Sequence, residues 1–69
     1  MINTVIFEEY NNYGTDYAKE SCLKSVNKFL EDRHISRSDI VEYKTDIWNE
    51  DIGDGCRYYN YRVILSYYK

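Results

Sequence analysis

The sequence predicts a small α+β domain in which one helix packs on one face of a three-stranded antiparallel sheet, in the order β-α-β-β. One segment has the apolar spacing of an amphipathic helix, and three segments are rich in β-branched and aromatic residues with turn residues between them. The composition, 43% hydrophobic and 30% charged, is typical of a globular chain. At 69 residues there is material for one modest core, so we expect a single domain over residues 1–69.

The first strand is expected at about residues 3–10, because Thr4 to Tyr10 form a β-rich run that the turn-forming "NNYG" ends. The helix is expected at about residues 15–33, with Thr15 as its N-cap and Asp16 in its first turn. Its apolar stripe recurs at spacings of four and three and consists of Ala18, Cys22, Val26, Phe29 and Leu30. This helix therefore has one face for a core and polar faces for solvent.

A hairpin is expected from two further strands, at about residues 39–50 and 56–68, joined by the Asp- and Gly-rich "NEDIGDG". A right-handed crossover makes the first two strands parallel, so the order 2-3-1 makes every neighbouring pair antiparallel and places the most apolar strand in the centre. The helix is then expected to cover one face of the hairpin, made of Val41, Tyr43, Ile47, Tyr59, Tyr61, Val63 and Leu65.

The closing segment "CRYYNYRVILSYYK" is apolar at both odd and even positions, so both faces of this strand carry aromatic or aliphatic side chains. A helix of this length reaches ~27 Å and the last strand ~40 Å, so the hairpin should outrun the helix by roughly 13 Å. We expect an interface or ligand-binding surface on the uncovered face. Its residues are Trp48, Tyr58, Arg62, Ile64 and Tyr68, with Tyr58 close to Trp48 across the turn. The register of the first strand, which decides between Ile6 and Phe7, stays open.

Motifs for catalysis or metal binding are lacking, so we expect no enzyme, no metal and no cofactor. His34 directly follows the helix, where a histidine caps carbonyls or points to solvent. Cys22 lies on the apolar stripe and Cys56 starts a strand, and we expect both to be reduced thiols. The acidic group Asp46, Glu50, Asp51 and Asp54 departs from the EF-hand pattern and is expected to be a solvated hairpin tip.

The net charge of −3 argues against binding to long nucleic acids, since that affinity comes from clustered Lys and Arg. The N-terminal "MINTVIFEEY" lacks the basic start of a signal peptide, and no segment approaches the ~20 apolar residues of a membrane span. We therefore expect a cytoplasmic protein without membrane partners.

Four segments together resemble the small acidic sporulation proteins of Bacillus-type bacteria, a family with relatives in phages. These are a short N-terminal strand, a helix around "SVNKFLED", the segment "DIVEYKTDI" and the aromatic closing strand "YYNYRVILSYYK". The resemblance covers most of the chain and implies a sporulation or phage setting, but no biochemical activity. The chain departs from the family by a longer "NNYGTDY" entry and more tyrosine. The strand order is also similar to that of dodecins, flavin-binding oligomers, as a fold-level analogy only.

Two functions follow from these observations. The first is a non-enzymatic interaction module that self-associates through the tyrosine-rich sheet face and has an accessory role in sporulation or phage–host biology. The alternative is a phage-encoded anti-defence protein that sequesters a nucleotide-type signal or directly inhibits a host protein. A nucleotide would bind where Trp48, a tyrosine and Arg62 converge, whereas self-association would bury Tyr58, Ile64 and Tyr68.

Overall fold

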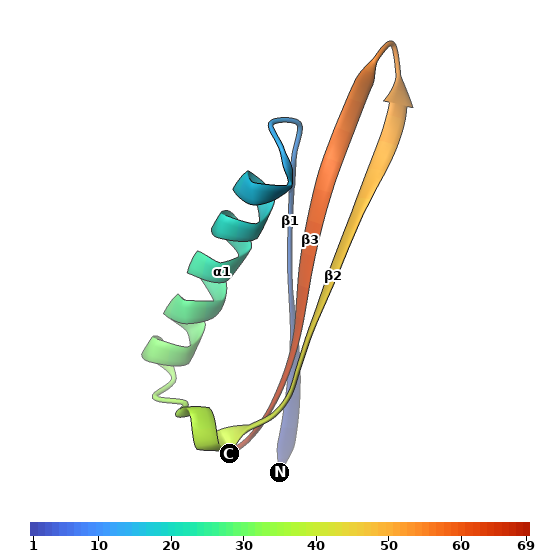
Figure 1. Cartoon of the computed structure of the whole chain (residues 1–69). Coiled ribbons are helices and arrows are strands. Elements are labelled where there is room, and N and C mark those ends of the chain that lie inside the picture. The colour runs from blue at the N-terminus through green and yellow to red at the C-terminus, as the bar shows by residue number, and fades with distance from the viewer.

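The computed structural model describes residues 1–69 and has the predicted architecture of one helix on a three-stranded antiparallel sheet (Figure 1). The elements are β1 (Ile2–Asn11), α1 (Thr15–Asp32), a short 3-10 turn η1 (Arg37–Asp39), β2 (Ile40–Gly53) and β3 (Cys56–Tyr68). The sheet order is β1-β3-β2, so the prediction of a central third strand is confirmed. No helix has the length and apolar content needed to cross a membrane.

The register of β1, which the sequence left open, is fixed by its pairing with β3, in which Phe7 lies opposite Val63 and Ile6 opposite Ile64. Phe7 therefore faces α1 and packs against the core, whereas Ile6 points to the other side and is 60% exposed. This arrangement follows from strand alternation, because only one of two consecutive side chains can face the helix.

The core lies between α1 and the two strands β1 and β3. Ala18, Cys22 and Val26 of the helix pack on Tyr61 and Val63 of the central strand. A second group of buried residues lies near the end of the helix and consists of Ile35, Leu65 and Tyr67. Phe7 packs against both groups. Its ring contacts Phe29 edge-to-face at 5.4 Å, and Phe29 contacts Tyr67 at 5.7 Å between ring centroids. The predicted apolar stripe of the helix is therefore the face that is buried.

The expectation that α1 also covers β2 is wrong. The helix packs on β1 and β3 and has almost no contact with β2, so Val41, Tyr43 and Ile47 are 57%, 45% and 58% exposed. A helix about 10 Å wide spans only two strands that lie ~4.8 Å apart. The turn from Asn11 to Gly14 is short and keeps the start of the helix beside β1. The helix therefore lies over β1 and β3 and leaves β2 uncovered.

The N-terminal end of α1 is not capped by Thr15 as expected, whereas His34 caps the C-terminal end. Gly14, not Thr15, occupies the N-cap position and no side chain caps the helix; Asn11 Oδ1 instead accepts hydrogen bonds from the backbone N–H groups of Tyr13 and Gly14. At the other end His34 adopts φ 54° and donates its backbone N–H to Glu31, while Ile35 donates to Leu30. This is a Schellman motif, so His34 acts through its backbone.

The hairpin is longer than expected, because β2 continues to Gly53 and the turn has only two residues, Asp54 and Gly55. Both turn residues have positive φ, 52° and 74°, as a type I′ turn requires. Figure 1 shows the hairpin extending beyond α1 and β1, as the element lengths predicted.

Replacing Leu65 with alanine should lower the free energy of unfolding by about 3 kcal/mol, because Leu65 is fully buried and the cavity adds to the lost transfer energy. The matched change Val41→Ala on exposed β2 should cost less than about 0.5 kcal/mol. Urea denaturation followed by circular dichroism measures both. Equal losses would contradict the placement of the core over β1 and β3.

Candidate functional site

The open face is the side of the sheet that points away from α1, and no element covers it. Strand pairing aligns its side chains in rows across β1, β3 and β2. The rows, in order from the chain termini toward the hairpin tip, are Ile2–Tyr68, Thr4–Ser66–Glu42, Ile6–Ile64–Lys44, Glu8–Arg62–Asp46, Tyr10–Asn60–Trp48 and Tyr58–Glu50. Large apolar side chains therefore lie on both sides of the ionic row Glu8–Arg62–Asp46, interspersed with polar ones.

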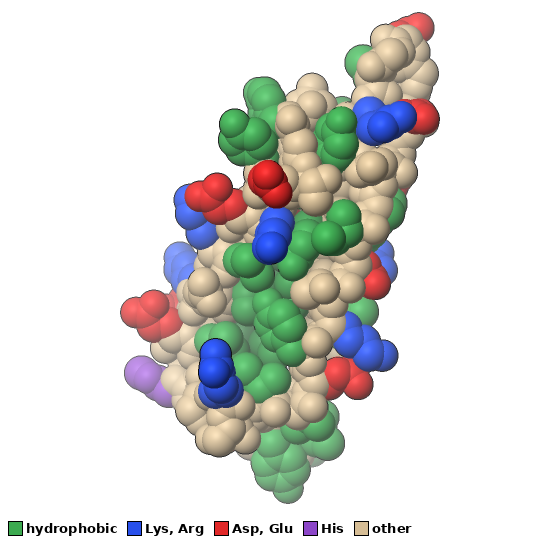
Figure 2. Space-filling model, viewed as in Figure 1, with side chains coloured by type: hydrophobic (Ala, Val, Ile, Leu, Met, Phe, Trp, Pro, Cys, Tyr) green, Lys and Arg blue, Asp and Glu red, His purple; other side chains and the backbone are tan.

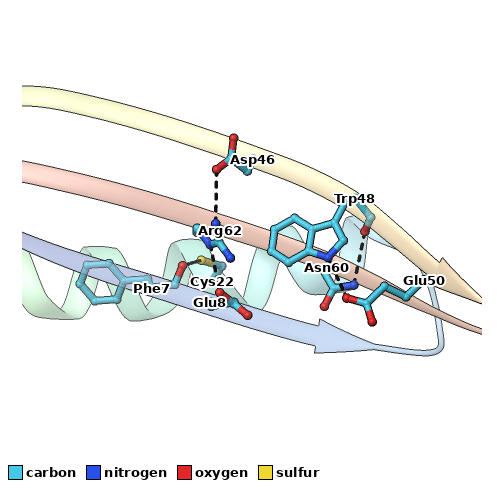
Figure 3. A network of polar contacts seen from close by, with 8 residues as sticks. All are labelled: Phe7, Glu8, Cys22, Asp46, Trp48, Glu50, Asn60 and Arg62. Carbon is cyan, nitrogen blue, oxygen red and sulfur yellow. Dashed lines mark hydrogen bonds and ion pairs between the residues drawn. The ribbon is translucent and has the colours of Figure 1, made fainter. Parts of the chain in front are cut away.

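Arg62 is the centre of the open face and bridges both edge strands (Figure 3). Its Nε donates to Glu8 Oε2 of β1 at 3.0 Å, and its Nη1 lies 3.8 Å from Asp46 Oδ2 of β2. The guanidinium carbon also lies 4.7 Å from the centroid of the Trp48 ring, a cation–π contact. One cation between two carboxylates leaves this row with an excess negative charge.

The aromatic residues at the hairpin end of the open face are partly ordered by polar contacts. Trp48 Nε1 donates to Glu50 Oε1 at 2.9 Å, and the amide of buried Asn60 donates to the Trp48 carbonyl oxygen at 3.5 Å. The ring of Tyr58 packs edge-to-face on Tyr10 of β1 at 5.5 Å. The ring of Tyr58 therefore packs on β1, whereas the sequence predicted Trp48 as its neighbour.

The five predicted site residues all lie on the open face, but they form two groups rather than one site. Trp48 and Arg62 are in direct contact, and Tyr58 lies one row beyond Trp48 toward the hairpin tip. Ile64 and Tyr68 lie toward the chain termini, beside Ile6 and Ile2 of β1. The residues that sequence reasoning missed are those of β1, because their side depends on the register: Ile2, Ile6, Glu8 and Tyr10.

A second uncovered surface is a groove between α1, η1 and β2, lined by Val26, Asn27, Leu30, Arg37, Ile40 and Tyr43. Figure 2 shows hydrophobic side chains gathered between the helix and the hairpin on this side of the molecule. The groove exists because α1 stops short of β2. Burial raises the pKa of Tyr43 at its edge, with the nearby Tyr61 hydroxyl adding to the effect.

The remaining titratable groups do not converge on a reaction centre. Three of the four carboxylates of the expected hairpin-tip group have separate partners, and Asp54 lies in the turn. Asp46 faces Arg62, Glu50 accepts from Trp48, and Asp51 Oδ1 pairs with Arg57 Nε at 2.8 Å. No group of three or more His, Cys, Asp or Glu side chains could hold a metal ion. Hydrogen bonds from Ser36 lower the pKa of Asp39, which closes the η1 capping box.

The two cysteines are free, and they differ in accessibility. Cys22 lies on the buried face of α1, where its Sγ donates weakly to the Phe7 carbonyl oxygen at 3.5 Å. Burial raises the pKa of the Cys22 thiol, and the negative charge of Glu9 raises it further. Cys56 is exposed at the start of β3. A thiol held protonated in the core is a packing group and not a nucleophile.

The comparisons with known proteins found no relative of this chain. No family model matches the chain, and neither a curated protein nor a solved structure matches it. The resemblance to small acidic sporulation proteins therefore stays a prediction.

Replacing Arg62 with methionine should lower the free energy of unfolding by about 1 kcal/mol, because Glu8 and Asp46 lose their shared cation and Trp48 loses its cation–π contact. The fluorescence of Trp48, the only tryptophan, should change in the folded state. Arg57→Met is the matched control, since its pair with Asp51 is solvent-exposed at the tip. A control effect as large as that of Arg62→Met would contradict the bridging role.

Stability should fall at alkaline pH because of Cys22. Its pKa is higher in the folded protein, so the unfolded thiol loses its proton first, and folding stability is lost as the pH rises above about 8.5. Urea midpoints between neutral and mildly alkaline pH measure this decline, which Cys22→Ala should reduce.

A thiol-specific reagent should modify Cys56 rapidly and Cys22 only on unfolding. Rapid modification of both thiols in the native protein would contradict the burial of Cys22.

Proposed function

We propose that this protein is a small, non-enzymatic interaction module that self-associates through the open face of its sheet. The observation that carries the proposal is that this whole face lacks cover although it presents large apolar side chains. Ile2, Ile6, Tyr10 and Tyr68 are 56%, 60%, 64% and 59% exposed. Apolar side chains grouped on one face of a small domain are typical of an interface.

The open face offers two apolar groups on either side of the Glu8–Arg62–Asp46 row. One group, toward the chain termini, comprises Ile2, Ile6, Ile64 and Tyr68, and the other, toward the tip, comprises Tyr10, Trp48 and Tyr58. A two-fold axis through the ionic row would place each group of one copy on a group of the other. Such isologous packing buries the apolar groups, while Arg62 keeps its contacts with Glu8 and Asp46 within each copy.

The charge of the open face favours this proposal over nucleotide sequestration. Glu8, Glu42, Asp46 and Glu50 outnumber the cations Lys44 and Arg62 on it, and Arg62 already has two carboxylate neighbours. A phosphate group would have to displace those carboxylates and would be repelled by the others. Two identical open faces also repel each other, but salt screens this repulsion and leaves the apolar contact.

The cellular setting is part of the proposal and rests on the resemblance described above. A cytoplasmic accessory role in sporulation, or in the interaction of a phage with its host, is compatible with a module that has no catalytic constellation. Inhibition of a host protein would use the same apolar groups, so it is the alternative that the experiment below separates from self-association.

Light scattering coupled to size exclusion, at several protein concentrations, should give a mass at least twice the 8.4 kDa of one chain. High salt should strengthen this association. Ile6→Asp should weaken it strongly, because it places a charge in an apolar group of the open face. The matched control Ile52→Asp changes an isoleucine of similar exposure, 54%, at the hairpin tip and should leave the mass unchanged.

A wild-type mass of 8.4 kDa at every concentration would overturn self-association and leave the face to a host protein. An unchanged mass for Ile6→Asp would show that the open face is not the contact.

A further inference from the structure

The edge of β2 is a second surface that the proposed function does not use. β2 lies at one side of the sheet, and all of its 14 residues except Ile40 and Trp48 are exposed. Its ladder with β3 is regular from Glu42 to Asp51, and its irregularities lie only at the two ends. A long, regular edge strand presents unpaired N–H and C=O groups to any strand that can align with it.

The middle of β2 lacks several of the features that block edge pairing, although it carries the charged residues Glu42, Lys44 and Asp46. Proline is absent from the chain, no bulge interrupts the middle of the strand, and the helix-facing positions Tyr43, Thr45 and Ile47 are uncharged. The other edge strand, β1, differs because its only charged residues are Glu8 and Glu9, so two copies repel each other there. Among the two edges, β2 is therefore the one suited to pairing with a copy of itself.

The charges of β2 restrict the registers that such pairing can adopt. Glu42, Lys44 and Asp46 alternate in sign along the open face. In an antiparallel pair with a two-fold axis at Thr45, Lys44 of each copy lies opposite Asp46 of the other copy. An axis at Lys44 or at Asp46 places like charges directly opposite each other, which is destabilising, whereas an axis at Tyr43 would also place opposite charges together, Glu42 against Lys44.

The apolar side chains fit the axis at Thr45. On the helix-facing side Tyr43 lies opposite Ile47 of the second copy, again twice, and the two Thr45 side chains meet at the axis. Aromatic and β-branched residues make favourable cross-strand pairs. Tyr43 and Ile47 are about half exposed in one copy because α1 does not reach β2. Each therefore gains a neighbour that the single chain does not provide.

We infer that β2 pairs antiparallel with β2 of a second copy about a two-fold axis at Thr45, extending the sheet from three strands to six. Both helices then lie on the same side, and the open faces of the two copies form one continuous surface on the other side. The edge contact is independent of the open-face contact. If both operate, two six-stranded sheets assemble into a tetramer.

The direct test is a cross-link at the axis. Opposite residues in an antiparallel pair have Cα atoms ~4.5–5.5 Å apart, within reach of a disulfide. Thr45→Cys in a Cys56→Ser background should therefore form a covalent dimer on mild oxidation. Asn49→Cys is the matched control, because Asn49 lies on the same side of the same strand. With the axis at Thr45, the two Cys side chains at position 49 would lie about 27 Å apart, at ~3.4 Å per residue along the strand. That control should stay monomeric on a non-reducing gel.

A second pair of variants tests the contact without a covalent cross-link. Thr45→Glu places two like charges opposite each other and should halve the solution mass, whereas Thr45→Val should keep it. Thr45 is exposed, so both variants retain the fold, which circular dichroism checks. No cross-link at Thr45, or an unchanged mass for Thr45→Glu, would overturn the inference. Ile6→Asp should leave the Thr45→Cys cross-link intact, so failure of the open-face proposal is distinguishable from failure of this one.

Discussion

The width of a single helix is the constraint on which the rest of this structure depends. A helix about 10 Å across covers two strands, and the sheet has three. Because the turn after β1 is short, α1 lies over β1 and β3, and β2 is left without cover on either face. The core, the groove beside Val26 and Leu30, and the exposed edge of the sheet all result from this one mismatch.

The two faces of the central strand β3 lie in very different environments. Tyr61, Val63, Leu65 and Tyr67 form the floor of the core, while Arg62 and Ile64 between them face the open side. This explains why the closing segment is apolar at both odd and even positions: β3 has strands on both edges, a helix on one face and half-buried side chains on the other. A chain this small has a core worth only ~3–5 kcal/mol, so association through the uncovered surfaces would also stabilise the fold.

The open face is not a uniform apolar patch, and this decides what it can bind. Strand register brings Glu8 and Asp46 to Arg62 from opposite sides, so the one central cation is neutralised within the chain. The apolar side chains on either side of that row remain available. A surface of this kind is suited to another protein surface with a similar alternation, and an identical copy provides one.

The amino-acid sequence by itself determined the elements and the order of the strands. The helix stripe from Ala18 to Leu30, the alternation in β2 and the Asp54–Gly55 turn are local patterns, and the crossover rule then leaves few ways to arrange three strands. The five candidate residues lie on one face of the sheet, because Trp48, Tyr58, Arg62, Ile64 and Tyr68 share one parity within the hairpin.

Only the tertiary structure decided the register of β1, the lateral position of α1 and the neighbours of Arg62. The segment "TVIFEE" has apolar residues at both parities, so its local pattern cannot say whether Ile6 or Phe7 faces the helix; the pairing of Phe7 with Val63 does. The exposure of Tyr43 and Ile47 was equally hidden, since their alternation is that of a covered strand. These features depend on distances between segments far apart in the chain, and local periodicity contains no information about such distances.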